Sequence, residues 1–482
     1  MNEERLVTQI TPKSEDFSRW YVDLIRRAEL ADYAPMKGMM VIRPYGYAIW
    51  ENIQKLLDKR IKASGHINAY FPLFIPESFL RKEMEHLKGF APEVAWVTHG
   101  GDDELEERLA VRPTSEAIIG YMYSKWIKSW RDLPVLINQW ANVVRWEKVT
   151  RPFLRTTEFL WQEGHTAHES YEEAQAETLL ILEMYREFVE NELAIPVIYG
   201  RKTEREKFAG ALATYAIEAL MSDGKALQMG TSHNLGQHFA RVFNIRFEDR
   251  NQELQYAWQT SWGVSTRLIG ALVMAHGDDS GLVFPPQVAP IQMVIVPISI
   301  GNWKETVLPV AKEIKNNLQN FGFRVFLDDR AEYTPGWKFS EWEMRGVPLR
   351  LEIGPRDIKN NQVVAVRREN PVKIALEISN LEIKVKQLLA EIQKAIYDKA
   401  LAFQKENTYE VTSYQDFKSV IEEKRGFIKA FWCGSEDCEA RIKEETMATI
   451  RVIPQSQEKP EKGKCVYCQK DAEIMAVFAR AY

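Results

Sequence analysis

The chain has 482 residues, of which 45% are hydrophobic, and its 63 basic and 68 acidic side chains give a formal net charge of −5. The length predicts roughly three domains, and the slightly acidic balance argues against non-specific coating of nucleic acid while permitting a local basic groove. The sequence has no long apolar run and no signal-like start. We therefore expect a cytoplasmic protein without a membrane span.

The first predicted block, residues 1–286, mixes helical and strand patterns. It has no glycine-rich phosphate loop, so an antiparallel sheet flanked by helices is favoured over a doubly wound nucleotide fold. A proline-rich joint at 284–290 closes the block. The predicted elements are helices at 14–31 and 45–64 and strands at 69–75, 135–138, 142–147 and 157–165.

The second block, residues 287–398, alternates strands and helices and predicts one compact α/β domain. The third block, residues 399–482, contains every cysteine of the chain. The elements expected in the second block are strands at 292–297, 324–328, 349–353 and 362–367 and helices at 305–320, 335–345 and 380–397.

The segment 144–168 carries the most informative pattern. It combines Arg145, Arg151 and Arg155 with several glutamates and aromatic side chains. Folded as a hairpin, it can hold a polyphosphate through arginine contacts and stack a flat ring on an aromatic face. The alternative is a salt-bridged hairpin at a dimer contact.

Three further elements complete a plausible site. Thr114-Ser115-Glu116 offers hydroxyls and a carboxylate at a helix start, although Thr114 as a simple N-cap explains the same pattern. The segment 228–233 brings an amide, hydroxyls and His233 to a strand, where a lone histidine is more often a packing residue. The segment 261–267 leads into an apolar helix through Arg267, whose guanidinium can reach a phosphate or cover a base.

Two close cysteine pairs, Cys433 with Cys438 and Cys465 with Cys468, have the spacing of a closed structural zinc site with four thiolate ligands. The alternative is a site that keeps this outline but holds no metal.

Seven short segments resemble prolyl-tRNA synthetases of the archaeal and eukaryote-like kind, in the order RPTSE, VRWE, PFLRT, EFLWQEGHTAH, KFAG, GTSH and SWG…TR. The resemblance continues in GVPLRLEIGPRD at 346–357 and in the cysteine block. It implies an α+β class II catalytic domain, an α/β anticodon-binding domain and a small α/β zinc-binding domain. It also implies a homodimeric ligase that uses ATP and Mg²⁺, contains structural Zn²⁺ and esterifies tRNA(Pro) with L-proline.

The resemblance assigns a role to each candidate residue. Arg145 and Arg267 are the expected catalytic residues, with Arg145 bridging the ATP α-phosphate and the proline carboxylate. The expected proline-binding residues are Thr114, Glu116, Arg145, Trp161, Glu163, His165, Phe208, His233, Ser261 and Trp262. The expected ATP-binding residues are Arg145, Glu147, Arg155, Thr156, Phe159, Gln228, Thr231, Ser265 and Arg267.

The remaining implied features lie outside this set. Arginine forks suit base edges, so anticodon contacts are expected at Glu343, Arg345, Arg350 and Arg356, against the alternative of charges on a solvated face. The helix 45–64 belongs to the implied dimer interface. At 213–219 the chain lacks two hydroxyls that relatives commonly have, and the segment between the second and third motifs leaves no room for the editing insertion of other prolyl-tRNA synthetases.

Two other functions fit parts of the pattern. A synthetase-like paralogue would transfer an amino acid elsewhere, but the retained anticodon block argues against it. A non-enzymatic RNA-binding protein would not need the arginines, Gln228 and the Thr114/Glu116 pair. The terminal Tyr482 is expected either to fold back toward the catalytic domain or to belong to a frayed tail.

Overall fold

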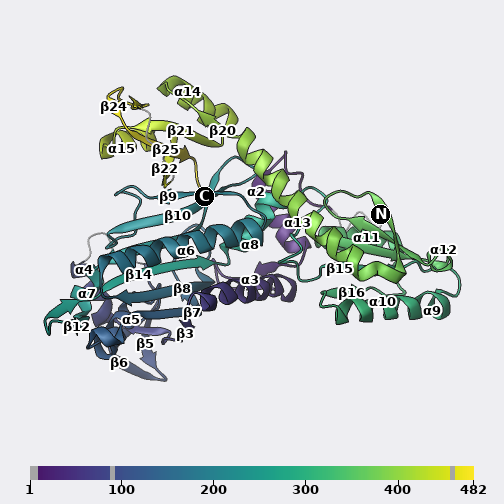
Figure 1. Ribbon diagram of the computed structural model, residues 1–482, viewed down its shortest axis with the longest axis horizontal. Helices are drawn as coiled ribbons and strands as arrows, with labels where there is room; N and C mark the ends of the chain where they lie inside the picture. The colour runs from purple at the N-terminus through teal and green to yellow at the C-terminus, as the bar shows by residue number, and fades with distance from the viewer. Residues whose placement is uncertain (1–8, 87–92, 456–461) are drawn as a thin grey trace.

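The computed structural model describes residues 9–86, 93–455 and 462–482. Figure 1 shows a large sheet at the centre, a smaller domain packed beside it and a third sheet region at the C-terminal end of the chain. Within the described residues, no helix combines the length and apolar character that crossing a membrane requires.

The N-terminal part, up to His276, forms most of the large sheet and the helices around it. Its helices are α2 (Phe17–Arg27), α3 (Pro44–Ala63), α4 (Glu77–His86), α5 (Glu116–Trp126), η1 (Trp130–Asp132), α6 (Tyr171–Asn191), α7 (His238–Phe243) and α8 (Arg267–His276). Its strands are β1 (Ala31–Tyr33), β2 (Met40–Ile42), β3 (Ile67–Asn68), β4 (Phe74–Pro76), β5 (Trp96–Gly100), β6 (Asp103–Val111), β7 (Val135–Val144), β8 (Glu158–His168), β9 (Val197–Arg201), β10 (Ala213–Leu220), β11 (Ala226–Gly236), β12 (Arg246–Glu248), β13 (Leu254–Tyr256) and β14 (Trp258–Ser265).

The large sheet is antiparallel from β9 through β10, β11, β14 and β8 to β7, and the edge strand β3 pairs with β7 in parallel. Helix α6 packs against β11 and β14 and extends along the sheet (Figure 1). Its start is fixed by Ser170, whose side chain accepts from the backbone N–H of Glu173 at 3.2 Å. Ile181, Tyr185 and Phe188 form its buried face. The expected antiparallel sheet flanked by helices is confirmed.

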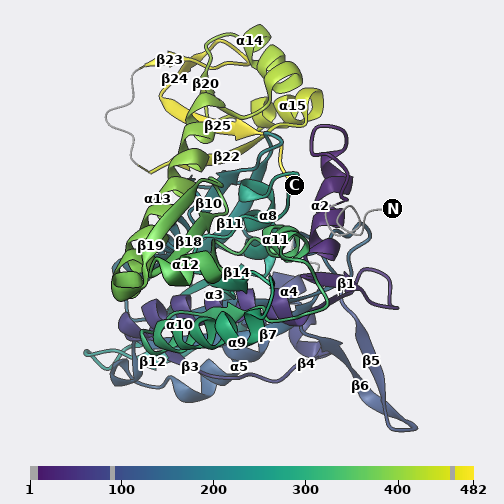
Figure 2. The ribbon, with the colours of Figure 1, turned by 90° about the vertical axis from the view of Figure 1, so that its right-hand side faces the viewer.

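The middle part is a separate five-stranded sheet in the order β16-β15-β17-β18-β19, with helices packed on it. Its long final helix α13 also runs up to the C-terminal part (Figure 2). The elements are β15 (Met293–Pro297), α9 (Trp303–Thr306), α10 (Leu308–Asn320), β16 (Val325–Leu327), α11 (Pro335–Met344), β17 (Leu349–Ile353), α12 (Pro355–Lys359), β18 (Gln362–Arg367), β19 (Lys373–Glu377), η2 (Ile378–Asn380) and α13 (Leu381–Glu406).

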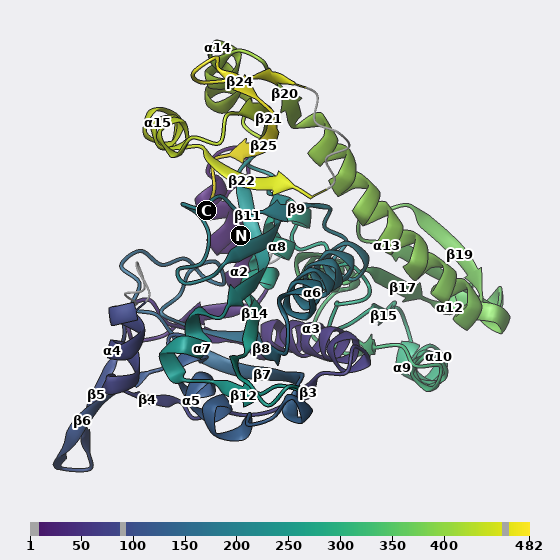
Figure 3. The same cartoon turned by 60° about the vertical axis from the view of Figure 1, so that its left-hand side comes forward.

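The C-terminal part extends the large sheet instead of forming an isolated one. Strand β22 pairs with β9 through Ile453 opposite Arg201, so the combined sheet has eleven strands (Figure 3). The elements are β20 (Thr408–Glu410), α14 (Tyr414–Ser419), η3 (Val420–Lys424), β21 (Phe427–Trp432), α15 (Glu436–Thr446), β22 (Thr449–Pro454), β23 (Gly463–Lys464), β24 (Asp471–Ala472) and β25 (Ile474–Ala479).

A buried ion cluster lies at this seam. The Glu218 carboxylate of β10 is fully buried and accepts from Lys202 Nζ at 2.6 Å and from the Arg451 guanidinium of β22 at 2.8 Å. Burial alone would raise the pKa of Glu218, but the two cations outweigh it and lower that pKa. Removing any member would leave an uncompensated buried charge, so the cluster ties the two parts together.

The chain end also returns to the large sheet. Tyr482 donates its hydroxyl to Asp223 at 2.7 Å, and its backbone N–H donates to the carbonyl of Ala226 at 3.2 Å. The Arg151 guanidinium lies 5.8 Å from the Tyr482 ring centre. Of the two alternatives for Tyr482, the one in which it folds back toward the catalytic domain is confirmed.

Candidate active site

A cavity of about 270 Å³ opens on the face of the large sheet that points away from α6. Alternation along β8 turns Trp161, Glu163 and His165 toward this cavity, while Gln162 on the opposite face accepts from the hydroxyl of Tyr185 of α6 at 2.6 Å. The cavity is lined by Thr114, Glu116, Arg145, Trp161, Glu163, His165, Glu206, Lys207, Phe208, Thr214, Gln228, Thr231, His233, Ser261, Trp262 and Gly263.

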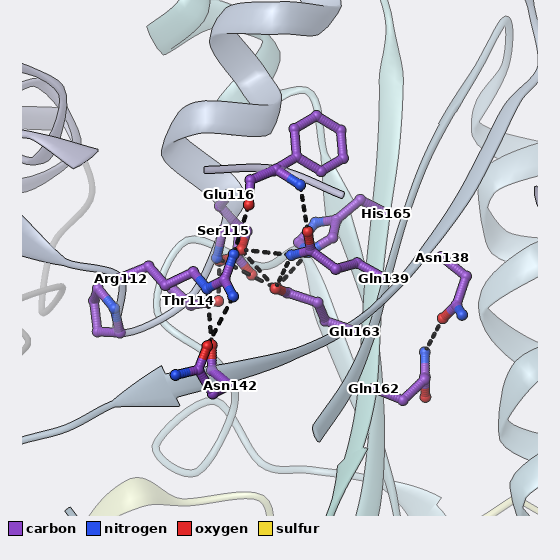
Figure 4. A network of polar contacts seen from close by, with 12 residues as sticks. Arg112, Thr114, Ser115, Glu116, Asn138, Gln139, Asn142, Gln162, Glu163 and His165 are labelled. Carbon is purple, nitrogen blue, oxygen red and sulfur yellow. Dashed lines mark hydrogen bonds and ion pairs between the residues drawn. The ribbon is translucent and has the colours of Figure 1, made fainter. Parts of the chain in front are cut away.

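Glu163 is the centre of a buried hydrogen-bond network at the base of the cavity (Figure 4). Its carboxylate accepts from Ser115 Oγ at 2.5 Å, from Gln139 Nε2 at 2.8 Å and from His165 Nε2 at 2.9 Å. Burial opposes ionisation of Glu163, but these donors outweigh it and lower its pKa. The hydrogen bond between Glu163 and His165 also raises the pKa of His165, against the effect of burial. The network fixes the orientation of both side chains.

Thr114 and Glu116 meet at the cavity wall. The Thr114 hydroxyl donates to the Glu116 carboxylate, and both side chains are largely buried. Helix α5 begins at Glu116 with Ser115 as the N-cap residue, so the interpretation of Thr114 as a simple N-cap is wrong. The pair leaves a buried carboxylate beside the cavity, where it can meet a positively charged amine.

Arg145 lies at the boundary between two cavities. Its Nε donates to the carbonyl of Pro113 at 3.0 Å, and its guanidinium lies 5.5 Å from the Phe159 ring centre and 5.3 Å from that of Trp161. Burial lowers the pKa of Arg145, although an arginine remains charged at neutral pH. These contacts hold a cation in a fixed place.

The second cavity, of about 360 Å³, includes Arg145, Glu147 and Arg155 in its lining. Arg155 is exposed, and its Nε lies 3.5 Å from a Glu147 carboxylate oxygen. Because Arg145 lines both cavities, molecules bound in the first and in the second can both contact its side chain.

Arg267 begins helix α8 beside the same sheet. Its Nε donates to the carbonyl of Leu154 at 3.2 Å and its Nη1 to that of Gln228 at 3.4 Å, while its backbone N–H donates to Ser265 Oγ at 3.2 Å. Burial, together with the charges of Arg145 and Arg155, lowers the pKa of Arg267 to about 10. The three positive charges of Arg145, Arg155 and Arg267 therefore make an environment suited to an anion.

His233 and Phe208 form another part of the wall. Their ring centres lie 4.8 Å apart, and His233 Nδ1 is 2.9 Å from Thr214 Oγ1. Burial and the neighbouring charge of His165 lower the pKa of His233 to about 3, so its imidazole is neutral at physiological pH. The segment 213–219 lacks two hydroxyls that relatives commonly have, but Thr214 of this segment still places a hydroxyl at the cavity.

Two expected site residues lie differently from the sequence expectation. Thr156 is buried, donates its hydroxyl to the carbonyl of Glu158 at 2.7 Å and lines a further cavity together with Arg151 and Pro152. The Trp262 indole packs against His66 and Tyr185 on the α6 face, with ring centres 5.1 and 6.4 Å away. Strand alternation therefore leaves only the backbone of Trp262 facing the cavity.

Sequence reasoning missed several residues of the site. Gln139 holds Glu163, together with the Ser115 hydroxyl that the sequence did indicate, and Glu206, Lys207 and Thr214 line the cavity. Gln139 could have been found from strand alternation, because it pairs with Glu163 across β7 and β8. Glu206 and Lys207 lie on an irregular loop, where the sequence carries no periodic signal.

The four cysteines converge in the C-terminal part. Their sulfur atoms all lie within 4.8 Å of one another, and the cysteines are not joined in disulfides. The Sγ atoms of Cys433 and Cys438 are 3.7 Å apart, as are those of Cys433 and Cys468. A tetrahedron with Zn–S distances of about 2.3 Å has sulfur–sulfur edges of about 3.8 Å. The arrangement therefore fits a closed metal site.

The expected anticodon residues divide into two groups. Glu343 and Arg350 line one small cavity of about 70 Å³, and Arg356 lies exposed on α12. Arg345 instead donates to Glu29 at 2.6 Å and lies 5.6 Å from the Tyr45 ring centre. Its guanidinium thus forms an ion pair between the middle part and the N-terminal part of the chain.

Comparisons with known proteins agree with this architecture. Family models match residues 96–276 as the tRNA synthetase class II core domain (G, H, P, S and T), 292–388 as an anticodon binding domain and 414–482 as the C-terminal domain of prolyl-tRNA synthetase. A protein of Natranaerobius thermophilus named proline–tRNA ligase is 60% identical over 100% of this chain and 99% of its own length. One of Alkaliphilus oremlandii with the same name is 59% identical with the same coverage.

A solved structure agrees as well. The crystal structure of prolyl-tRNA synthetase from Cryptosporidium parvum, complexed with halofuginone and AMPPNP, superposes with a TM-score of 0.95 at 42% identity, covering 100% of this chain and 99% of that one. The chain belongs to the prolyl-tRNA synthetase family of class II aminoacyl-tRNA synthetases.

Proposed function

We propose that this chain is a proline–tRNA ligase, which joins L-proline to AMP at the expense of ATP and then esterifies tRNA(Pro). The observation that carries the proposal is the position of Arg145 between a cavity with a buried carboxylate and a cavity with exposed cationic groups. An amino acid and a nucleotide triphosphate need these two environments side by side. ATP is used with Mg²⁺, as in the class II synthetases.

The first cavity is proposed as the proline site. The Glu116 carboxylate, with Thr114 beside it, would meet the charged secondary amine, and Trp161 and Phe208 would contact the ring. The Ser261 hydroxyl is buried and has no hydrogen-bond partner within the described residues, which is the state of a group that awaits a ligand. The other proposed proline-binding residues are Arg145, Glu163, His165, His233 and the backbone of Trp262.

The second cavity and its surroundings are proposed as the ATP site. Arg155 and Arg267 would hold phosphates, and the Phe159 face would stack the adenine ring. Gln228 and Thr231, which line the first cavity, are also proposed to bind ATP. The other proposed ATP-binding residues are Arg145, Glu147 and Ser265.

The proposed reaction needs no protein nucleophile. A proline carboxylate oxygen attacks the α-phosphorus of ATP, the bond to the β-phosphate oxygen breaks, and its electron pair leaves with pyrophosphate. Arg145 stabilises the negative charge that builds up between the two substrates. A hydroxyl of the terminal tRNA ribose then attacks the proline carbonyl carbon, and AMP leaves. The protein contributes positioning and electrostatics.

Cys433, Cys438, Cys465 and Cys468 are proposed to hold a structural Zn²⁺. Their thiolates would close the coordination sphere and leave no open position for chemistry. The ion would stabilise the C-terminal domain, which we take as residues 399–482.

The rest of the chain divides into a catalytic domain, residues 1–286, and an anticodon-binding domain, residues 287–398, in this proposal. Glu343, Arg350 and Arg356 are the proposed anticodon contacts, because the first two share a cavity on one face. A cytoplasmic location agrees with the reaction, since its tRNA substrate is found there.

A homodimer is also proposed. Four large apolar side chains are 44% to 71% exposed: Ile67, Tyr70, Phe74 and Trp126. The first three come soon after α3 in the chain, and Trp126 is the last residue of α5. Exposed apolar groups gathered in one region mark an interaction surface. Light scattering on the purified protein should give twice the mass of the chain.

Charging of a tRNA(Pro) transcript with labelled proline separates this function from the two alternatives. We expect proline to be esterified to tRNA(Pro) and not to tRNA(Ala). A chain that formed the adenylate but charged no tRNA would be a synthetase-like paralogue. A chain that bound tRNA(Pro) without forming an adenylate would be an RNA-binding protein built on the same fold.

A further inference from the structure

The loop between β9 and β10 forms the outer lip of the proposed proline cavity. Glu206, Lys207 and Phe208 of this loop line the cavity. The loop is anchored at Thr203, whose carbonyl accepts from the backbone N–H groups of Glu206 at 3.2 Å and Lys207 at 3.0 Å. It is anchored again where the backbone N–H of Phe208 donates to Thr214 Oγ1 at 2.9 Å. The shape of the lip therefore depends on the carbonyl of Thr203 and on the hydroxyl of Thr214.

The C-terminal domain holds the first of these anchors. Thr203 Oγ1 donates to Glu439 Oε1 of α15 at 2.7 Å. Thr203 is 3% exposed and Glu439 is 4% exposed, so solvent does not replace this bond if it is lost. Figure 3 shows β22 of the same domain beside β9, from which the lip emerges.

Lys202, the residue before Thr203, is also linked to the C-terminal domain. Lys202 shares the buried Glu218 carboxylate with Arg451 of β22. Outside the anchor, Lys443 of α15 lies 3.3 Å from Glu206, but its side chain is 53% exposed and such a pair contributes little. The buried contact of Glu439 is thus the one that can set the position of Thr203.

We propose that Glu439 is a positioning residue for proline binding, which acts through Thr203 on the lip of the cavity. The inference rests on the proposed assignment of this cavity to proline. It gives the C-terminal domain a part in amino-acid recognition, although none of the residues described in that domain lines the cavity. Because the lip faces the amino-acid cavity and not the nucleotide, loss of the contact should weaken binding of proline and leave binding of ATP unchanged.

The test measures proline-dependent ATP–pyrophosphate exchange on the full-length protein. Glu439→Leu and Thr203→Val each remove the bond, and we expect each to raise the KM for proline roughly tenfold while kcat and the KM for ATP stay within about twofold. The double variant should be no worse than either single one, since both remove the same bond. Glu439→Gln keeps an acceptor oxygen and should retain a KM near that of the unaltered protein. Glu444→Gln, an exposed change on the same helix, is the matched control.

Zinc content and thermal unfolding of each variant complete the experiment. An unchanged KM for proline in folded Glu439→Leu would overturn the proposal. So would a rise in KM accompanied by an equal fall in kcat and by loss of zinc, because that pattern indicates a purely structural role. Failure of the proposed function would look different: the unaltered protein would show no exchange with proline. Failure of the cavity assignment would leave Glu116→Gln with a normal KM for proline.

Discussion

At the scale of single residues, the site depends on charges that are buried and fixed before any substrate arrives. Arg145 is held by the Pro113 carbonyl and by two aromatic rings, and Glu163 by three side-chain donors. Groups fixed in this way need not reorganise when charge develops in the transition state. In the proposed reaction, the site would therefore be preorganised for the adenylate-forming step.

The Arg145→Ala variant tests this arrangement. Losing one such charge contact costs about 3 kcal/mol, so proline-dependent pyrophosphate exchange should fall about a hundredfold or more. The fold should survive, because Arg145 lines cavities and is not part of the core. Arg19→Ala, at an exposed arginine on α2, is the control and should leave exchange unchanged. Near-normal exchange in folded Arg145→Ala would refute its role.

The resemblance to prolyl-tRNA synthetases predicted the cavity residues, and most of them do line it. It did not predict where each side chain points. Thr156 and Trp262 lie on the expected segments, but local hydrogen bonding and strand alternation turn their side chains elsewhere. Gln139 was missed because a supporting residue bears no catalytic signature.

At the scale of elements, boundaries with clear start or stop signals were predicted well. Strands β17 and β18 have the expected bounds, and α11 begins at Pro335 after the N-cap Thr334. The strand expected at 69–75 is wrong, since β3 and β4 lie on either side of a gap that contains Pro72, which lacks a backbone donor. Strand β19 was missed. Helix α13 runs to Glu406, beyond the expected 397, because no glycine or proline stops it.

The end of α8 leads to a pH prediction. His276 is buried and its Nε2 lies 2.8 Å from the Leu193 carbonyl, and burial lowers its pKa to about 4. Between about pH 6.5, the ordinary histidine value, and about pH 4, the unfolded chain binds a proton that the folded chain does not. Stability should therefore fall as the pH drops through this window. Calorimetry of His276→Gln should show a shallower fall in Tm, and an equal slope in both proteins would contradict the assignment.

The cysteine cluster is the second element open to direct test. Cys433→Ser should release zinc and loosen the C-terminal domain, because one thiolate ligand is lost. Adenylate formation should persist, since the sulfur atoms lie outside both proposed substrate cavities. Metal analysis finding no zinc in unchelated, unaltered protein would contradict the site. Exchange activity that disappeared together with the metal would show that the cluster supports catalysis.

At the scale of the whole molecule, strand pairing between β22 and β9 joins the C-terminal domain to the catalytic sheet. The sequence predicted the blocks but not this continuity, because pairing between distant strands depends on register and leaves no local pattern. The buried cluster of Glu218, Lys202 and Arg451 has the same character: each charge alone is unremarkable in sequence, and only the fold brings them together.

The domain composition also predicts errors in amino-acid selection. Alanine and cysteine fit a cavity shaped for proline, and the missing ring methylenes weaken binding by only about 1–3 kcal/mol. Between β8 and β14, every residue belongs to α6, α7, β9 to β13 or the short loops that connect them, so that segment contains no further domain. Preformed Ala-tRNA(Pro) incubated with the pure protein should persist as long as in buffer. Rapid deacylation that depends on the protein would reveal an editing site.

The most direct measurement of the central claim is ATP–pyrophosphate exchange with each of the common amino acids in turn, on the purified full-length protein. Proline should support the fastest exchange, with weak exchange for alanine and cysteine and background rates for larger side chains. A different amino acid exchanging faster than proline, or no exchange with any, would contradict the account.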